Sequence, residues 1–267
     1  RPPRSTLFPY TTLFRSCTAA VKDELGTFPL LINSICAAVK YWSHLHSLGE
    51  DTLAFRSLCE NYTLTQQNRL CWLKHIKLLF LKFDLQNYWE NVGGVDIRLC
   101  TKKLSYRMRT TYIDNWSKYI NGEGRESNKL RTYCKLKETN FGREKYLGLN
   151  LPIHKRKLFT KLRISAHNLH IEQGRYNKTP ADERICCYCQ TGEVEDEFHF
   201  MLKCPKYHSL RTTLSNTLSA FKFEYLPDHD KFIFLMNCND GNNYVAKQVL
   251  KYVNSAMEVR LNGKMSS

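Results

Sequence analysis

The stretch CCYCQTGEVEDEFHFMLKCP, residues 186–205, holds four cysteines and a histidine. Cys186 and Cys189 are separated by two residues, His199 follows after nine more, and Cys204 after a further four. A tight turn between two cysteines lets both thiolates bind one ion, and three cysteines with one histidine form a tetrahedral set that zinc prefers. The spacing therefore predicts a small zinc-stabilised unit whose ligands are Cys186, Cys189, His199 and Cys204.

Two further residues of this stretch affect whether the ligands can meet. Asp196 is placed to cap a short helix that carries His199. Positions five apart lie well off one face of an unbroken helix, but Pro205 biases Cys204 away from helical geometry. We therefore expect Cys204 to leave the end of the helix and to turn back towards the ion.

Neighbouring thiols and imidazoles are alternative ligands. Cys187 could compete for a ligand place, although a pair of cysteines with one residue between them makes a poorer chelating turn. Three histidines outside the compact span are alternative nitrogen donors: His167, His170 and His208. The remaining alternative is that the thiols are unrelated and that His199 is a surface histidine without a metal.

The rest of the chain has a mainly helical pattern. Apolar residues recur at helical spacing in 35–48, 65–83 and 102–120, and three further helices are predicted in 207–221, 228–237 and 242–261. In 102–120 the recurring apolar residues predict a core-facing stripe: Leu104, Met108, Tyr112, Trp116 and Tyr119. We expect a mainly α fold with regions of helical bundle.

A polar segment with two glycines, NGEGRESN at 121–128, is typical of a linker. It separates a helical region, 17–120, from a region with a basic helix and the zinc-binding unit, 129–225. The last predicted region, 226–267, consists of C-terminal helices.

The first sixteen residues, RPPRSTLFPYTTLFRS, differ from the remainder. They lack the continuous apolar run of a secretory signal, and they back-translate into a sequence that resembles a widely used sequencing-library adapter. We interpret residues 1–16 as an artefact of that origin and exclude them from the fold. On this interpretation the biological sequence begins at Cys17, inside an open reading frame, and any localisation signal upstream of it is lost.

The chain remains strongly basic without that segment. The 40 lysines and arginines fall to 37 when Arg1, Arg4 and Arg15 are removed, against 25 acidic residues, which leaves a net charge of +12. Such a surplus favours a polyanion, and nucleic acid before a membrane, because no lipid-anchor motif or amphipathic basic tail accompanies it. No apolar run approaches the length of a transmembrane helix. A single cysteine cluster with a histidine favours a reducing, intracellular compartment.

The residues around the cluster carry a resemblance to a known family. KLRISAHNLHIEQGRYNK (161–178), followed by ERICCYCQTGEVEDEFHFMLKCPKYHSLR (183–211), resembles the cysteine–histidine segment near the C-terminus of reverse transcriptases from non-LTR (LINE-type) retrotransposons. LGTFPLLINSICAAVKYWSHL (25–45) is more weakly similar to the region after the polymerase domain. The resemblance implies the same four zinc ligands, a nucleic-acid role in target-primed reverse transcription, a nuclear location, and reverse transcriptase domains upstream in the parent protein.

The catalytic centre of such a polymerase is missing from the sequence. A polymerase needs paired carboxylates that bind two metal ions, and members of this family carry them in an aromatic-x-Asp-Asp motif. The chain contains no Asp-Asp pair. We therefore expect it to correspond to the C-terminal part of the family without polymerase activity.

Basic and aromatic residues around the cluster predict a surface for RNA or DNA, because cations bind phosphates and exposed rings stack on bases. The predicted contacts are Lys161, Arg163, His167, Arg175, Tyr176, Lys178, Arg184, Lys203, Lys206 and Arg211. For the neighbouring Phe198 and Phe200, packing around a small zinc core is an equal alternative.

Two other functions stay open. Some site-specific relatives carry a restriction-like endonuclease built from Pro-Asp and a later acid-x-Lys, and this chain has Pro227-Asp228 with Asp230 and Lys231. These residues are too close in sequence to occupy two adjacent strands, so Asp228 is better explained as a helix cap; 258–260 is the only later approximation. The last alternative is a transposon relic without a cellular role.

Overall fold

The computed structural model describes residues 17–94, 96–122, 130–137, 141–238 and 243–263. The segment 1–16 and most of the predicted linker lie outside these residues. The described chain is helical, and its one β pairing is an isolated antiparallel bridge between Ile185 and Val194. The prediction of a mainly α fold is confirmed. No helix in the described part combines the length and the apolar character needed to cross a membrane.

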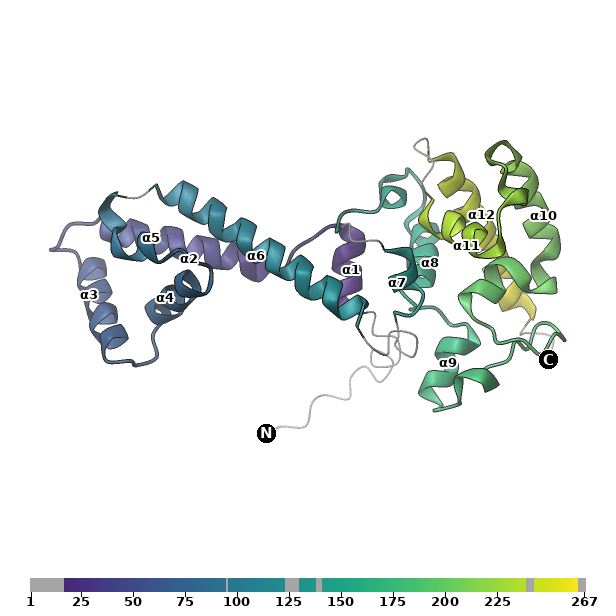
Figure 1. Cartoon of the computed structure of the whole chain (residues 1–267), viewed down its shortest axis with the longest axis horizontal. Coiled ribbons are helices and arrows are strands. Elements are labelled where there is room, and N and C mark those ends of the chain that lie inside the picture. Colours follow the sequence, from purple (N-terminus) through teal and green to yellow (C-terminus); the bar gives the residue numbers. More distant parts are fainter. Residues whose placement is uncertain (1–16, 95, 123–129, 138–140, 239–242, 264–267) are drawn as a thin grey trace. The chain divides into compact units, whose positions relative to one another are not determined.

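The chain forms two compact units (Figure 1). The middle unit, Phe28–Tyr119, contains helices α2 (Leu30–His46), α3 (Leu53–Gln66), α4 (Trp72–Lys82), α5 (Gln86–Glu90) and α6 (Ile97–Ile120). The cysteine–histidine unit consists of the described residues up to Thr27 together with those from Ile120 onward. Its helices are α1 (Thr18–Leu25), α7 (Tyr133–Leu136), α8 (Ile153–Arg163), α9 (His170–Tyr176), α10 (His208–Thr217), α11 (Asp228–Asn237) and α12 (Tyr244–Gly263).

This division differs from the predicted one at the N-terminal side. The sequence predicted a single helical region over 17–120, whereas α1 belongs with the residues after Ile120. Two acidic residues of α1 explain why: Glu24 pairs with Arg163 at 2.9 Å, and Asp23 accepts a hydrogen bond from the Tyr133 hydroxyl at 3.0 Å. Both carboxylates are buried. Partners so distant in sequence leave no local pattern, so this boundary could not be predicted from the sequence.

The middle unit is built around aromatic packing. Trp42 of α2 is 1 % exposed, stacks on Trp89 with ring centroids 5.3 Å apart, and meets the edge of Phe80 of α4. Leu73 and Ile76 of α4 complete this apolar core. The helix predicted over 65–83 is shorter than expected, because α4 begins only at Trp72, and residues 65 and 66 are the end of α3.

The apolar stripe predicted to face the core is buried only in part in helix α6. Leu104 and Trp116 are buried and Tyr112 packs edge-on against Phe28, whereas Tyr119 is 59 % exposed. The cations of this helix lie at other positions around its circumference. The first half of α6 therefore contributes apolar residues to the core and leaves polar and charged residues at the surface.

In the cysteine–histidine unit, α12 lies against three other helices, α8, α10 and α11 (Figure 1). The residues that α12 buries are apolar over most of its length: Val245, Ala246, Val249, Leu250, Val253 and Ala256. The same core includes Phe200, Met201 and Cys204 of the stretch quoted above. The metal-binding stretch is thus part of the hydrophobic core of this unit.

Candidate metal centre

The first two cysteines lie on a loop closed by backbone hydrogen bonds. The Cys186 N–H donates to the Glu193 carbonyl at 2.9 Å, and the Glu195 N–H donates to the Arg184 carbonyl at 3.0 Å. Gly192 has φ of +72°, a backbone conformation that glycine adopts without steric cost because it has no side chain. The chain can therefore reverse within a few residues and bring Cys186 and Cys189 to the same side of the loop.

The other two ligands lie at the two ends of a single helical turn. The Asp196 carboxylate accepts the His199 N–H at 2.7 Å, so Asp196 caps this short helix as predicted. Residues His199–Lys203 form a π-turn, in which the Cys204 N–H donates to the His199 carbonyl at 2.8 Å. A π-turn joins residues five apart. Cys204 therefore returns to the side of His199, before Pro205 begins the next turn.

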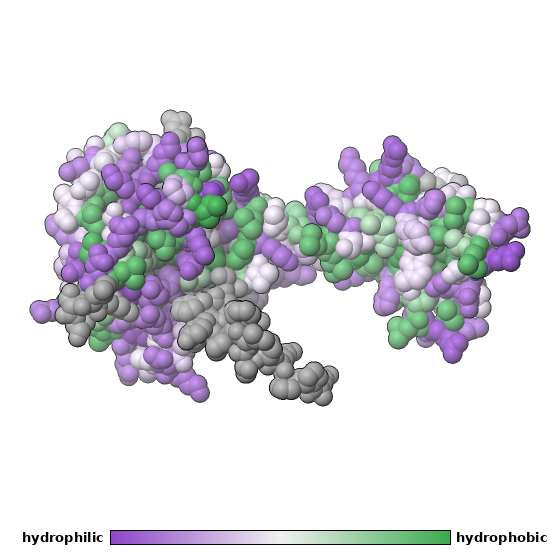
Figure 2. All heavy atoms as spheres, turned by 180° about the vertical axis from the view of Figure 1, so that it is seen from behind, coloured by the Kyte–Doolittle hydropathy of each residue, from purple (hydrophilic) through white to green (hydrophobic). Residues whose placement is uncertain are grey.

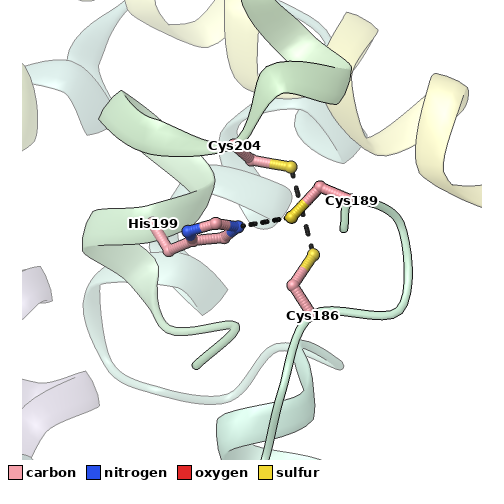
Figure 3. Close-up of side chains that lie close together, drawn as sticks. All are labelled: Cys186, Cys189, His199 and Cys204. Carbon is pink, nitrogen blue, oxygen red and sulfur yellow. Dashed lines mark hydrogen bonds between the residues drawn. The ribbon is translucent and has the colours of Figure 1, made fainter. Parts of the chain in front are cut away.

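The four predicted ligands converge in space. Their ligand atoms all lie within 4.8 Å of one another, and Figure 3 shows the side chains pointing towards a common centre. The sulfurs of Cys186 and Cys204 are 3.9 Å apart, and the Cys189 sulfur is 3.3 Å from His199 Nε2. A zinc tetrahedron with bonds of about 2.3 Å to sulfur and about 2.0–2.1 Å to nitrogen separates such atoms by about 3.8 and 3.6 Å. The residues fit a four-coordinate metal ion.

The surroundings of the ligands favour a bound cation. Burial raises the pKa of the Cys186 and Cys204 thiols, so a nearby positive charge is needed to keep both as thiolates. At the half-buried Cys189, burial is outweighed by hydrogen bonds from Thr191 and by the proximity of His199, which lower the thiol pKa to about 7. The site thus contains one thiol ready to ionise and two that need the metal.

A carboxylate outside the ligand set orients the histidine. Glu193 Oε2 lies 2.8 Å from His199 Nδ1, which makes Nδ1 the protonated ring nitrogen and leaves the Nε2 lone pair directed at the thiols. Metal-bound histidines commonly donate their second N–H to such a carboxylate. Glu193 was not among the predicted site residues.

The alternative ligands do not join the group. Cys187 is exposed and its sulfur lies 3.6 Å from His170 Nε2. His167 is buried and engages Glu197 at 2.7 Å, and His208 is exposed on α10. Only the predicted four residues form a metal-sized group in the part of the chain that the structure describes.

Two more acidic residues of the stretch tie the site to distant helices. Glu195 forms a buried bidentate pair with Arg260 of α12, at 2.8 and 2.9 Å. Both carboxylate oxygens of Glu197 accept hydrogen bonds from Arg131 Nη2, at 2.8 and 2.9 Å. Glu197 also accepts a hydrogen bond from the Ser165 hydroxyl at 3.0 Å. The alternation of Glu193, Glu195 and Glu197 is a sequence signal that could have pointed to these roles. Their partners could not be identified from the sequence.

Several predicted nucleic-acid contacts are occupied inside the fold, and for these the prediction needs correction. Arg163 is 1 % exposed and His167 is 5 % exposed. Each is hydrogen-bonded to a buried carboxylate, Arg163 to Glu24 and His167 to Glu197. Arg184 donates to the carbonyls of Thr179 and Ile171 and packs over Gly174, where an added Cβ would lie 2.6 Å from it. Arg163 and His167 therefore stabilise the fold and do not present charge to the surface, whereas Arg184 is half-buried and bonded to backbone carbonyls.

The remaining predicted contacts lie at or near the surface. Arg175 pairs with Glu172 at 3.3 Å, Lys203 pairs with Asp228, and Arg211 donates to the Lys203 carbonyl at 3.3 Å. Lys203 is exposed, as are Tyr176, Lys178 and Lys206, and Lys161 is half-buried. Of the two phenylalanines, Phe200 is fully buried against Tyr207, as the packing alternative required, and Phe198 packs on Phe232.

The endonuclease alternative lacks its scaffold within the described residues. Asp228 is the first residue of α11, and its carboxylate is shared between two cations, Lys203 and Lys231. It does not cap the helix, because Pro227 holds the N-cap position. No two adjacent strands occur in the described ranges, and Arg260 is buried against Glu195.

The site is therefore a closed group of three thiols and one imidazole, oriented by Glu193 and fixed to α12 through Glu195. All four positions of a tetrahedron are filled by protein atoms, which is the arrangement of structural zinc sites rather than catalytic ones. Comparisons of the chain with protein-family models, with curated proteins and with solved structures returned no match.

Proposed function

We propose that this chain is a zinc-containing, nucleic-acid-binding C-terminal part of a non-LTR retrotransposon reverse transcriptase. The observation that carries the proposal is the convergence of Cys186, Cys189, His199 and Cys204 at separations matching a zinc tetrahedron. Three thiolates and one imidazole select zinc over hard cations such as magnesium and calcium, which prefer oxygen ligands. The similarity of residues 161–178 and 183–211 to the family segment is the reason for proposing a reverse transcriptase of this family as the parent protein.

In this proposal zinc has a structural role. It joins the loop of Cys186 and Cys189 to the π-turn of His199 and Cys204, and so fixes the acidic residues between them. Glu195 then meets Arg260, and Glu197 meets Arg131. The protein supplies the shape and charge of the surface, and the metal holds that surface in place.

The nucleic-acid part of the proposal rests on charge. The net charge of +12 without residues 1–16 favours a polyanion. Since Arg163 and His167 are buried and Arg184 is bonded to backbone carbonyls, the contacts that remain for phosphates include Lys161, Lys178 and Lys206, with Tyr176 available to stack on a base. Either RNA or DNA would satisfy this chemistry. The nuclear location in this proposal rests on the family resemblance of residues 161–178 and 183–211 alone.

Metal content tests the first half of the proposal. Purified chain should contain one zinc per molecule, and Cys204→Ser should lose it. Cys187→Ser is the matched control, because Cys187 is exposed and directed at His170. Zinc should be released as the pH falls into the mildly acidic range, since protons compete with the metal for thiolates and imidazole. Equal loss of zinc from both variants would contradict the ligand assignment.

A salt titration tests the second half. Binding to single-stranded RNA, single-stranded DNA and duplex DNA should weaken steeply between 50 and 200 mM salt, because each neutralised phosphate releases counterions. Replacing Lys161, Lys178 and Lys206 together with glutamine should weaken all sequences about equally and flatten the salt dependence. A wild-type chain that binds zinc but none of the three nucleic acids at low salt would favour the relic instead.

A further inference from the structure

Helix α6 of the middle unit carries a continuous basic stripe at the surface. Arg98, Lys102, Tyr106 and Arg109 follow one another at spacings of four, four and three residues. Such spacings place side chains on one face of an α-helix. All four are exposed, Tyr106 by 71 %. We propose that this stripe, named here the α6 face, is a binding surface for single-stranded nucleic acid.

The charge of the α6 face is not balanced by acids on the same helix. Asp114 is the one acidic residue of α6, and it lies twelve positions after Lys102, about a third of a turn away from the stripe. Asp96 precedes the helix, where its carboxylate accepts the N–H groups of Arg98 and Leu99 at 2.8 and 3.2 Å. That carboxylate is engaged at the helix N-terminus. The face therefore presents a positive potential.

A hollow of about 420 Å³ lies beside Tyr106, between α6 and the end of α4. Its lining includes the ring of Phe83, and the Lys82 ammonium lies 5.6 Å from the centre of that ring. Arg107 is also in the lining, where it donates to the carbonyls of Phe83 and Asp84 and pairs with the Asp84 carboxylate at 3.7 Å. The Asp84 carboxylate in the lining is therefore paired with Arg107, and the Lys82 ammonium contributes a further positive charge to the hollow.

The cations, the exposed Tyr106 ring and the hollow beside it together indicate which class of partner this face binds. An exposed aromatic ring beside a hollow can stack on a base, and cations at intervals along a helix can contact successive phosphates. Stacking requires an unpaired base, because a duplex covers the faces of its bases. The hydropathy view in Figure 2 shows hydrophilic side chains over much of the surface of both units, with scattered apolar ones among them. The α6 face combines charge with one prominent ring, which fits single-stranded RNA or DNA.

This inference goes beyond the proposed function, because the middle unit holds none of the four metal ligands. It gives the chain a second contact with nucleic acid that does not depend on zinc. Two contacts on one chain increase the overall affinity when both can be engaged by the same strand.

The test uses the full chain with fluorescent 20-nucleotide oligomers of uridine and of thymidine, together with a duplex of the same length. Tyr106→Ala should weaken binding of the single strands by about 5- to 150-fold, the worth of one stacked base. Tyr106→Phe is the matched control, since it keeps the ring, and it should bind as the wild type does. The Arg98→Gln/Lys102→Gln double variant should lower the slope of log affinity against log salt by about 1.4.

A second double variant, Arg56→Gln/Arg69→Gln, removes the same charge from exposed positions outside the α6 face and should leave that slope unchanged. Zinc content should stay the same in every variant. Equal binding by Tyr106→Ala and Tyr106→Phe, equal slopes for the two double variants, or displacement of the oligomer by polyglutamate at the same charge concentration would each overturn the inference. Weakening confined to the Lys161, Lys178 and Lys206 variant would overturn it while leaving the proposed function intact.

Discussion

The two units are stabilised in opposite ways. The cysteine–histidine unit buries charge: Arg163 with Glu24, and Arg260 with Glu195, are ion pairs in which every side chain is 1 % exposed. The middle unit buries apolar and aromatic side chains, and no charged side chain is buried among its described residues. Its ion pair, Arg107 with Asp84, lies at the surface with side chains 41 % and 87 % exposed.

This difference determines how each unit responds to damage. A buried ion pair adds little net stability, but the loss of one partner leaves an unpaired charge in a medium that solvates it poorly. An apolar core loses stability in proportion to the atoms removed and the cavity left behind. The cysteine–histidine unit should therefore depend on a few specific partners, and the middle unit on the quality of its packing.

Removal of the metal should produce the largest contrast. Structural zinc contributes about 10–16 kcal/mol in small zinc peptides at neutral pH, so a chelator should unfold the region around Cys186–Cys204. The middle unit, which lacks these ligands, should keep its helices. Circular dichroism and thermal unfolding with and without chelator would measure this. An unchanged single transition would contradict it.

Replacement of Arg260 by methionine should be the next largest effect. It leaves Glu195 buried without its partner and should lower the free energy of unfolding by about 3–5 kcal/mol. Zinc affinity should fall too, because Arg260 also lies 4.7 Å from the centre of the Tyr188 ring, between the first two cysteines.

The matched control for that variant removes the stranded charge. Arg260→Met combined with Glu195→Leu should recover most of the lost stability in denaturant titrations, since an apolar pair of similar volume often replaces a buried ion pair without cost. Failure of the double variant to recover would show that the pair acts through its geometry rather than its charge.

In the middle unit, Leu73→Ala should lower the free energy of unfolding by about 2–5 kcal/mol, because Leu73 is fully buried in the apolar core. Zinc content and metal affinity should be unaffected, since the two units have separate cores. Parallel measurements of zinc and of denaturant unfolding would check both statements. Loss of zinc in this variant would show that the units are coupled.

The smallest effect is expected at a helix end. Thr52 caps α3 by accepting the Phe55 N–H at 3.2 Å, and Thr52→Ala should cost about 1 kcal/mol. Thr52→Ser, which keeps the hydroxyl, should remain close to the wild type. Thermal unfolding resolves a difference of this size.

The metal site could be predicted from the sequence because its information is local. Two close cysteines, the capping Asp196 and the Pro205 that follows Cys204 all lie within twenty residues, and the structure places them as expected. The mainly helical fold followed from apolar periodicity in the same way. Both depend on residues that are near one another along the chain.

What the sequence could not provide were the partners of buried charges. Arg163 was predicted to meet phosphate because it stands in a basic segment, yet its partner Glu24 lies 139 residues away. His167 likewise meets Glu197 across 30 residues. A cation on the surface and a cation in a buried pair look alike in sequence, so Arg163 and His167 were wrongly assigned to the predicted nucleic-acid surface.

The position of α1 has a consequence for synthesis. Thr18–Leu25 leaves the ribosome before the middle unit, but Tyr133 and Arg163, which pair with Asp23 and Glu24, follow more than a hundred residues later. In the interval the whole middle unit emerges, and domains generally fold as units while the chain is still growing. We therefore expect the middle unit to fold first, with α1 waiting as an unpaired acidic segment until the later helices appear. The Glu195–Arg260 pair forms later still, because Arg260 of α12 is made after Glu195.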